Sequence, residues 1–337
     1  MQKCDLYIPL EQNRVQCLAC RHCCIISDGK RGICRVRENR NGSLYNLVYG
    51  LLVAQGADPI EKKPLYHVLP GSQTWSVASV GCNMHCLHCQ NVEIAAYDDS
   101  SSGRFPGQPV DPQATVRQAQ SNDCRSISYT YTEPTVWLEY ALDTGRLAAD
   151  AGLWNFFVTN GYITPQALDK LATVLHGANI DLKGFTEDFY HRVCGAKLSE
   201  TLDNIRDYRR RGIWLEITTL VIPGENDDDA QLNGIARFIA DELGKDTPWH
   251  LSRYFPCHKM KHPPTPLASM ERALEAADRA GLHYTYVGNM SGSGRESTRC
   301  PACGTVVVSR NGYQVSSINM NDGTCKVCGK EIAGIWG

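Results

Sequence analysis

Between residues 74 and 290, short apolar segments alternate with longer segments whose apolar residues recur at helical spacing. The longer segments predict helices over 111–121, 135–151, 165–176, 199–211, 227–243 and 267–281. The short segments predict strands at Thr74–Val80, Ser126–Tyr131, Asn155–Thr159, Asn179–Leu182, Trp214–Ile222, Trp249–Phe255 and His283–Val287. This alternation predicts an α/β fold whose parallel sheet curls into a full or partial barrel. An open doubly wound sheet is the alternative that periodicity leaves.

Segments of different composition flank this core at 74–290. Residues 1–45 are rich in Cys, Arg and Gly with little periodicity, which predicts a small metal-stapled module. Residues 46–73 contain three X-Pro steps, and we expect an extended or turning connector. Residues 291–337 predict a zinc-ribbon-like module, with the Gly-Ser-Gly at 292–294 as a hinge.

Composition narrows the function classes. A net charge of −2 favours neither nucleic acid nor an acidic membrane surface as a partner. No apolar run approaches the roughly 18 residues of a membrane span, and the first residues lack a signal-peptide pattern. The abnormal feature is 16 cysteines. Without an export signal, a reducing cytoplasm is expected, so that metal binding is favoured over disulfides.

The central cysteines lie directly after the first predicted core strand. Cys82, Cys86 and Cys89 have the spacing Cys-x3-Cys-x2-Cys. A [4Fe-4S] cube takes one thiolate at each iron, so three thiolates in a tight loop leave one iron open for a small molecule. The alternatives are a redox dithiol and a zinc site completed by His85 or His88.

The C-terminal cysteines form two Cys-x-x-Cys knuckles, each followed by Gly, around a predicted hairpin at 305–318. The four residues are Cys300, Cys303, Cys325 and Cys328. This arrangement predicts a tetrahedral site in which zinc is favoured over a rubredoxin-like iron. A structural staple is favoured over a role in binding substrate or a partner.

The N-terminal cysteines Cys17, Cys20, Cys24 and Cys34 predict a third metal site. Zinc and a fully ligated auxiliary [4Fe-4S] cluster are both consistent with their spacing. The remaining cysteines lack spacing partners: Cys4, Cys124 and Cys194 are expected to be ordinary apolar residues or free thiols, and Cys257 is a weak candidate for facing the active site.

Several polar motifs follow the predicted strands, besides the loop that contains Cys82. They are Thr132–Pro134, Thr159–Gly161, Asp181–Lys183 and Pro223–Asp227. In an α/β barrel the carboxyl ends of the strands meet at one rim, where active sites lie. We therefore expect these motifs to converge on one site.

The segment GCNMHCLHCQN at 81–91 resembles the signature loop of radical S-adenosylmethionine (radical SAM) enzymes. With this resemblance, we expect a partial (β/α)6 barrel. The resemblance implies that S-adenosylmethionine chelates the open iron and that one electron cleaves it to methionine and a 5′-deoxyadenosyl radical. It implies that Glu133 accepts from the methionyl ammonium, that Asp181 and Lys183 line the methionyl end, and that Asn160 faces the cofactor. Thr132-Glu133-Pro134 departs from the family's Gly-Gly-Glu by lacking both glycines.

The 181–183 and 221–227 segments resemble activating enzymes of glycyl-radical proteins, such as the pyruvate formate-lyase activating enzyme. A closer resemblance, through DPIEKKPLYHVLPGS at 58–72, the N-terminal cysteines and the final Gly-Ile-Trp at 334–336, is to the radical enzyme of the AmmeMemoRadiSam system. It implies an oxidoreductase that acts on an unidentified small molecule, peptide or protein, with an electron donor such as flavodoxin or ferredoxin. The alternatives are a glycyl-radical activase and a zinc-stapled interaction protein without catalysis.

Overall fold

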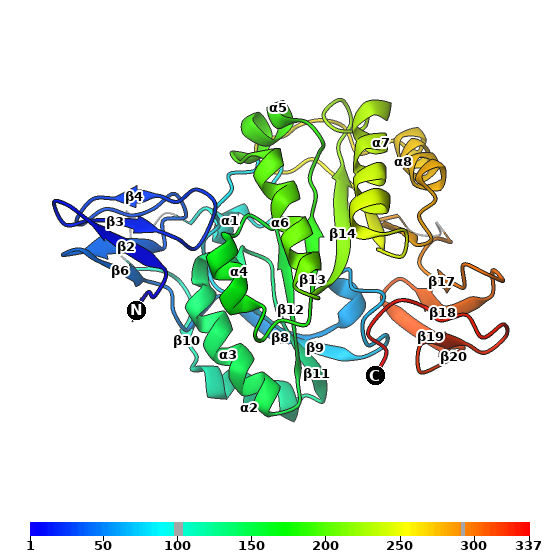
Figure 1. The fold of residues 1–337 in the computed structure, drawn as a ribbon, viewed down its shortest axis with the longest axis horizontal. Coiled ribbons are helices and arrows are strands. Elements are labelled where there is room, and N and C mark those ends of the chain that lie inside the picture. The colour runs from blue at the N-terminus through cyan, green and yellow to red at the C-terminus, as the bar shows by residue number, and fades with distance from the viewer. Residues whose placement is uncertain (98–103, 291–293) are drawn as a thin grey trace.

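The computed structural model describes residues 1–97, 104–290 and 294–337, and in these residues a sheet of eight strands forms the centre of the molecule (Figure 1). The sheet consists of β8 (Ala54–Pro59), β9 (Gln73–Ala78), β11 (Cys124–Tyr129), β12 (Trp154–Thr159), β13 (Gly177–Asp181), β14 (Trp214–Val221), β15 (Trp249–Arg253) and β16 (Thr285–Gly288). The strands from β9 to β16 are parallel, and β8 joins β9 antiparallel. The prediction of an α/β fold with a mostly parallel sheet is confirmed.

The strand order β16-β15-β14-β13-β12-β11-β9-β8 follows the chain without reversal. A doubly wound sheet reverses its order at a switch point, so the doubly wound alternative is wrong. Right-handed crossovers between neighbours in such a sheet place the helices on one face, as in a barrel. Among the described residues, β16 and β8 do not pair with each other, which leaves the barrel open.

The helices lie between the strands, and all except the short ones at 92–95 and 187–189, which the sequence did not predict, are close to their predicted positions. They are α1 (Val92–Ala95), α2 (Pro112–Ser121), α3 (Leu138–Asp150), α4 (Pro165–Leu171), α5 (Glu187–Phe189), α6 (Leu198–Arg210), α7 (Asp229–Phe238) and α8 (Leu267–Ala280), with short 3₁₀ or π turns η1 (Ile60–Lys62), η2 (Pro134–Trp137), η3 (Tyr190–Cys194) and η4 (Ile239–Leu243). The side chains of Asp111, Thr164 and Asp228 cap α2, α4 and α7 by accepting from a backbone N–H. None of the described helices is long and apolar enough to cross a membrane.

The connector contributes more than an extended link. Its β8 is the antiparallel edge strand of the sheet, and its β7 (Leu51–Leu52) pairs with β10 (Gln108–Pro109). The β8 sequence AQGADP contains Gly and Pro and does not alternate apolar with polar residues, so its pattern does not indicate a strand. An edge position tolerates proline, which has no N–H to donate to a ladder.

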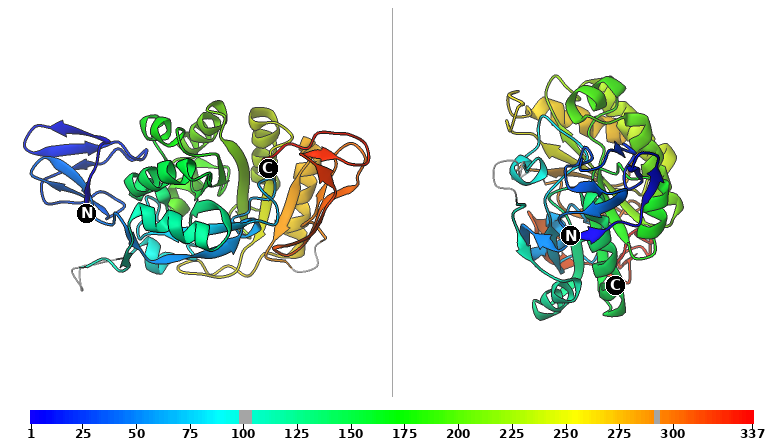
Figure 2. Two further views of the ribbon diagram at one scale, coloured as in Figure 1. Left: turned by 90° about the horizontal axis from the view of Figure 1, so that it is seen from below. Right: turned by 90° about the vertical axis from the view of Figure 1, so that its left-hand side faces the viewer.

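Small antiparallel sheets lie at opposite ends of the long axis (Figure 2). The N-terminal sheets are formed by β1 (Gln2–Lys3), β6 (Ser43–Asn46) and β5 (Arg37–Arg40), and by β2 (Tyr7–Leu10), β3 (Arg14–Cys17) and β4 (Ile25–Ile26). The C-terminal strands are β17 (Thr298–Arg299), β18 (Val306–Asn311), β19 (Gln314–Ile318), β20 (Met320–Asn321) and β21 (Thr324–Cys325). Most of the expected hinge lies outside the described residues, and the domain boundaries stay predictions.

A buried carboxylate ties the connector to the barrel at the end away from the strand-end loops. Glu216 on β14 accepts the backbone N–H groups of Tyr66 and His67 over 2.9 and 2.8 Å, and a bond from His250 Nε2 over 2.6 Å. Burial alone would raise the pKa of Glu216, but these neighbours lower it below the ordinary 4.5. An ionised, fully bonded Glu216 therefore orders the connector beneath the sheet.

Candidate functional site

The loop at 81–91 follows β9 and carries the three central cysteines. Gly81 has φ 104°, and a Cβ there would lie 2.8 Å from Val36 Cγ1, so that only glycine fits this turn. Two backbone N–H groups of the loop donate to the carbonyls of Val193 and Cys194 in η3, each over 2.9 Å. The loop is thus fixed by the turn at Gly81 and by backbone hydrogen bonds to η3.

A cavity of about 340 Å³ opens beside this loop at the carboxyl ends of the parallel strands. Its lining includes every residue predicted for the central site: Cys82, Cys86, Cys89, Glu133, Asn160, Asp181 and Lys183. These residues come from the loops after β9, β11, β12 and β13, or from the last residue of β13. Four of the five predicted motifs therefore meet in one cavity.

The fifth motif, 223–227, follows β14 at the same rim of the sheet, but its residues do not line the cavity. Its Asn226 side chain donates to the carbonyls of Lys183 and Leu220 over 2.7 and 2.8 Å. Lys183 and Leu220 both line the cavity, so the motif stabilises the cavity wall without lining it.

The spacing of the central sulfur atoms favours a cube over zinc. Zinc ligands lie about 2.3 Å from the ion, so tetrahedral sulfurs stand about 4 Å apart. Of the residues that the structure describes, only one group brings three or more Cys, His or acidic ligand atoms within 4.8 Å of one another. This group, the C-terminal quartet, consists of Cys300, Cys303, Cys325 and Cys328. Among the described residues, Cys82, Cys86 and Cys89 do not form so compact a group, with or without His85 or His88. A cube takes each thiolate at a separate corner.

His88 is a cavity residue that the sequence suggested only as a zinc ligand. Burial, with a contribution from the Lys183 charge, lowers the pKa of His88 to about 3, so its ring is neutral at pH 7. Its buried Nδ1 has no hydrogen-bond partner within the described ranges. Buried polar atoms are almost always bonded, so this nitrogen fits a site that receives a ligand.

Glu133 is buried at the cavity wall. Its Oε1 accepts from the backbone N–H of Thr135 and from the hydroxyls of Thr135 and Thr159, and its Oε2 accepts the N–H of Asn160 over 2.8 Å. Burial raises the pKa of Glu133 despite these donors. No ion pair is found for Glu133 among described residues, so a bound cation would complete the environment of this carboxylate.

Asn160 connects the β12 loop to the cysteine loop. Its Nδ2 donates to Asn83 Oδ1 over 2.7 Å and lies 3.7 Å from Cys82 Sγ. Its Oδ1 accepts the N–H of Tyr162 over 2.9 Å. Both the nitrogen and the oxygen of the Asn160 amide therefore form hydrogen bonds within the protein, and the amide positions Cys82.

Asp181 and Lys183 form an ion pair of 2.8 Å at the cavity. Burial would lower the pKa of Lys183, but Asp181 raises it well above 10.5, so that the ammonium stays charged.

A hydrogen bond from the Cys194 thiol lowers the pKa of Cys86 against the effect of burial, and Lys183 adds to this lowering. Cys194, expected to be an ordinary thiol, thus supports the thiolate of Cys86, while Cys257 bonds the Cys89 carbonyl over 3.5 Å.

Tyr131 explains how the loop before Glu133 dispenses with the family's glycines. It has φ 66°, a left-handed conformation that is costly for a bulky residue. Its hydroxyl donates to Asp58 over 2.8 Å, and the Lys63 ammonium lies 4.6 Å from its ring centroid. These contacts hold Tyr131 in the wall of the cavity, which Lys62 also lines. The sequence offers no signal for them, because they depend on the β8 pairing.

The C-terminal quartet differs in geometry from the N-terminal quartet, which consists of Cys17, Cys20, Cys24 and Cys34. In the C-terminal quartet, Cys300 Sγ lies 3.5 Å from Cys328 Sγ, and Cys303 Sγ lies 3.8 Å from Cys325 Sγ. All four sulfurs lie within 4.8 Å of one another, a geometry that fits one tetrahedral metal ion. The N-terminal cysteines Cys17, Cys20, Cys24 and Cys34 line a separate pocket and are not drawn together in this way.

Comparison with known proteins gives matches over the barrel and over the whole chain. The family model described as the radical SAM superfamily matches residues 76–232. The uncharacterized protein MJ0808 of Methanocaldococcus jannaschii is 42% identical over 335 residues, which cover 98% of this chain and 99% of that protein. The pyruvate formate-lyase 1-activating enzyme of Escherichia coli K12 is 22% identical over 164 residues, or 48% of this chain and 66% of that enzyme.

Among solved structures, Streptococcus suis SuiB superposes with a TM-score of 0.50 at 12% identity, covering 69% of this chain and 52% of SuiB. This likeness concerns the fold alone. The family match and the curated relatives together show that residues 76–232 form a radical SAM domain with homology to pyruvate formate-lyase activating enzymes.

Proposed function

We propose that the chain is a radical SAM oxidoreductase in which Cys82, Cys86 and Cys89 hold a [4Fe-4S] cluster and the adjoining cavity binds S-adenosylmethionine. The observation that carries the proposal is that the three cysteines share one cavity with Glu133 and the Asp181–Lys183 pair. When bound, the cluster and S-adenosylmethionine supply a one-electron reductive cleavage that gives methionine and a 5′-deoxyadenosyl radical for hydrogen abstraction.

The charged residues suit the methionyl end of this cofactor. Glu133 is a buried carboxylate that has no cationic partner among the described residues, and we assign it to the methionyl ammonium. Lys183 keeps its charge beside Asp181 and is assigned to the carboxylate, with Asp181 as its positioning partner. Asn160 orients the loop at Cys82, and the unpartnered Nδ1 of His88 is available to the bound cofactor.

The C-terminal quartet is assigned to a single zinc ion that staples the tail. The short sulfur separations of 3.5 and 3.8 Å support one tetrahedral ion. The described tail residues share a small apolar cluster with Tyr66, Tyr284 and Tyr286, and a metal would contribute directly to the folding of the tail. A rubredoxin-like iron has the same ligands, and metal analysis distinguishes the two.

The substrate is an unidentified small molecule, peptide or protein, and the electron donor belongs to the flavodoxin or ferredoxin class. A cytoplasmic location and membership of the AmmeMemoRadiSam system stay predictions. A glycyl-radical activase is the second candidate, favoured by the 22% identity to the Escherichia coli activating enzyme. The family match argues against a zinc-stapled protein without catalysis.

Anaerobic reconstitution followed by reduction tests the proposal. The wild-type chain should convert S-adenosylmethionine to 5′-deoxyadenosine, and Cys82→Ala should abolish this conversion. Cys124→Ala is the matched control, since Cys124 is a buried cysteine that does not line the cavity. Cleavage that survives in Cys82→Ala contradicts the assignment. Deuterium transfer from a labelled glycyl-radical protein into 5′-deoxyadenosine would select the second candidate.

A further inference from the structure

The N-terminal cysteines converge although they come from several segments of the module. Cys17, Cys20, Cys24 and Cys34 line one pocket, whose other walls include Ile26 and Arg37. Cys17, Cys20 and Cys34 are buried, and Cys24 is half-buried. Four thiols gathered around a shared space form a candidate metal site that the central cavity does not include.

The separation of these sulfurs excludes the compact arrangement of the C-terminal quartet. A structural zinc site brings its four sulfurs within about 4 Å of each other. Residues 300–328 show this arrangement, with all four sulfurs inside 4.8 Å, but no three ligand atoms of the N-terminal quartet meet that limit in the described chain. In a cube each thiolate binds a different corner, which places the sulfurs about 6 Å apart. The two quartets therefore suit different metal groups.

The order of the ligands along the chain supports the same distinction. Three of the thiolates fall within residues 17–24, and the fourth follows at Cys34 after a loop. A tight triplet with one distant ligand is typical of iron–sulfur proteins, whereas two separated Cys-x-x-Cys knuckles are typical of zinc. The C-terminal quartet has the knuckle arrangement, so the contrast in sequence matches the contrast in geometry.

The surroundings of the pocket suit an anionic cluster shielded from water. The side chain of Arg37 is buried and lines the same pocket as the four cysteines. Arg37 is held by Glu139 over 2.7 Å and by the Val136 carbonyl over 3.0 Å. A positive charge is therefore held permanently beside the thiolates.

We propose that Cys17, Cys20, Cys24 and Cys34 hold a second [4Fe-4S] cluster, with a cysteine on every iron. Such a cluster has no open iron for S-adenosylmethionine, and its chemistry is one-electron exchange. The proposal stands on the N-terminal geometry. Only the assignment of the central cluster as its electron acceptor rests on the function proposed for the central site.

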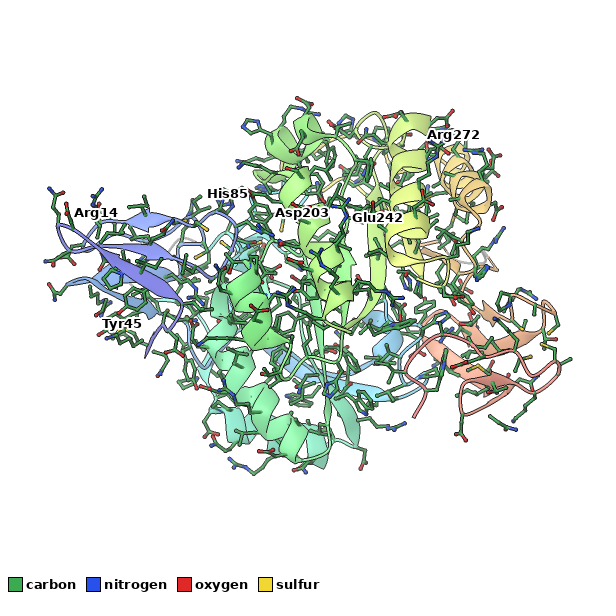
Figure 3. All side chains as sticks on the ribbon, viewed as in Figure 1. Arg14, Tyr45, His85, Asp203, Glu242 and Arg272 are labelled. Carbon is green, nitrogen blue, oxygen red and sulfur yellow. The ribbon has the colours of Figure 1, made fainter. Side chains whose placement is uncertain are left out.

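The quartet lies directly against the central cysteine loop. The carbonyl oxygen of Cys34 is 3.3 Å from the position of a Cβ on Gly81, and His22 Nε2 hydrogen bonds the Asn83 carbonyl over 2.8 Å. His85 of the same loop lies where the N-terminal module meets the barrel (Figure 3). One electron from a flavodoxin- or ferredoxin-class donor would enter the N-terminal cluster and leave to the central cluster, so that the N-terminal cluster returns to its starting state.

Metal analysis of a chain without the central ligands tests the site by itself. After anaerobic reconstitution, the Cys82→Ala, Cys86→Ala, Cys89→Ala variant should keep about four irons and about four sulfides. Adding Cys20→Ala and Cys34→Ala should remove them, whereas adding Cys124→Ala should not. Zinc in place of iron, a single iron without sulfide, or an N-terminal site without metal would overturn the proposal. Failure of wild-type S-adenosylmethionine cleavage, with these irons retained, would count against the proposed function alone.

Electron paramagnetic resonance tests the proximity of the two clusters, and it does not require the five-fold variant to fold. Two reduced clusters in neighbouring sites relax each other magnetically. The reduced wild-type chain should therefore show faster spin relaxation than the triple variant. A triple variant that has no cluster signal, or that relaxes at the wild-type rate, contradicts the proposed arrangement.

Discussion

Glu133 Oε2 accepts the backbone N–H of Asn160 over 2.8 Å, and this bond joins the loop after β11 to the loop after β12. Asn160 in turn reaches toward Cys82 with its side-chain amide at 3.7 Å. The carboxylate assigned to the cofactor and the first cysteine of the loop are therefore linked through one residue.

Glu133→Gln should weaken S-adenosylmethionine binding to the reconstituted protein about tenfold or more, because a hydrogen bond to a charged group contributes about 1.5–3 kcal/mol. Anaerobic equilibrium binding measures the change. Glu271→Gln, at an exposed position on α8, is the matched control and should bind like the wild type. Equal affinities in Glu133→Gln and the control, at equal iron content, would refute the role given to Glu133.

Gly81→Ala should sharply reduce the iron held by the central loop. The new Cβ would meet Val36 Cγ1 at 2.8 Å, in addition to the strain of a positive φ. Gly152→Ala is the matched control, since Gly152 has φ 74° and nothing within 4 Å of its Cβ position. It carries the backbone strain without the clash, so its iron content should stay near wild type. Similar iron losses in both variants would show that the contact with Val36 is unimportant.

Glu216→Gln should lower the free energy of unfolding by about 2–3 kcal/mol at pH 7, since the buried charge is hydrogen bonded to four groups. The pKa of Glu216 is lowered in the folded state, so its stabilisation is present above 4.5 and is lost as pH falls through the folded pKa. Urea unfolding at a series of pH values should show the gap to wild type narrowing below 4.5. Glu275→Gln, exposed on α8, should change stability little at any pH. A gap that stays constant with pH would argue against an ionised Glu216.

Cys328→Ser should remove about one metal ion per chain and leave the tail open to proteolysis, because a four-ligand structural site depends on each thiolate. Metal analysis and limited proteolysis after residue 294 measure the two effects. Cys124→Ser should keep both the metal and the protection. An unchanged zinc content in Cys328→Ser would exclude the quartet as the site.

The parallel strands and their helices follow from the sequence because hydrophobic periodicity and capping residues act between near neighbours. The β9 and β14 predictions and the spacing of Cys82, Cys86 and Cys89 are all read within a few residues. Parallel strands end at one edge of a sheet, and the positions of Glu133 and Asp181 at the ends of their strands therefore predicted that they lie close together. Both residues line the same cavity.

Other features arise from contacts between distant segments, and the pattern of residues does not encode them locally. The pairing of β8 with β9 brings Lys62 to the cavity and holds Tyr131 in its left-handed conformation. The spacing of the cysteines suggested metal in both outer quartets, but the separation of their sulfurs depends on how each module packs. Sequence spacing limits which ligands can meet, whereas three-dimensional packing sets the distances that distinguish a single ion from a cube.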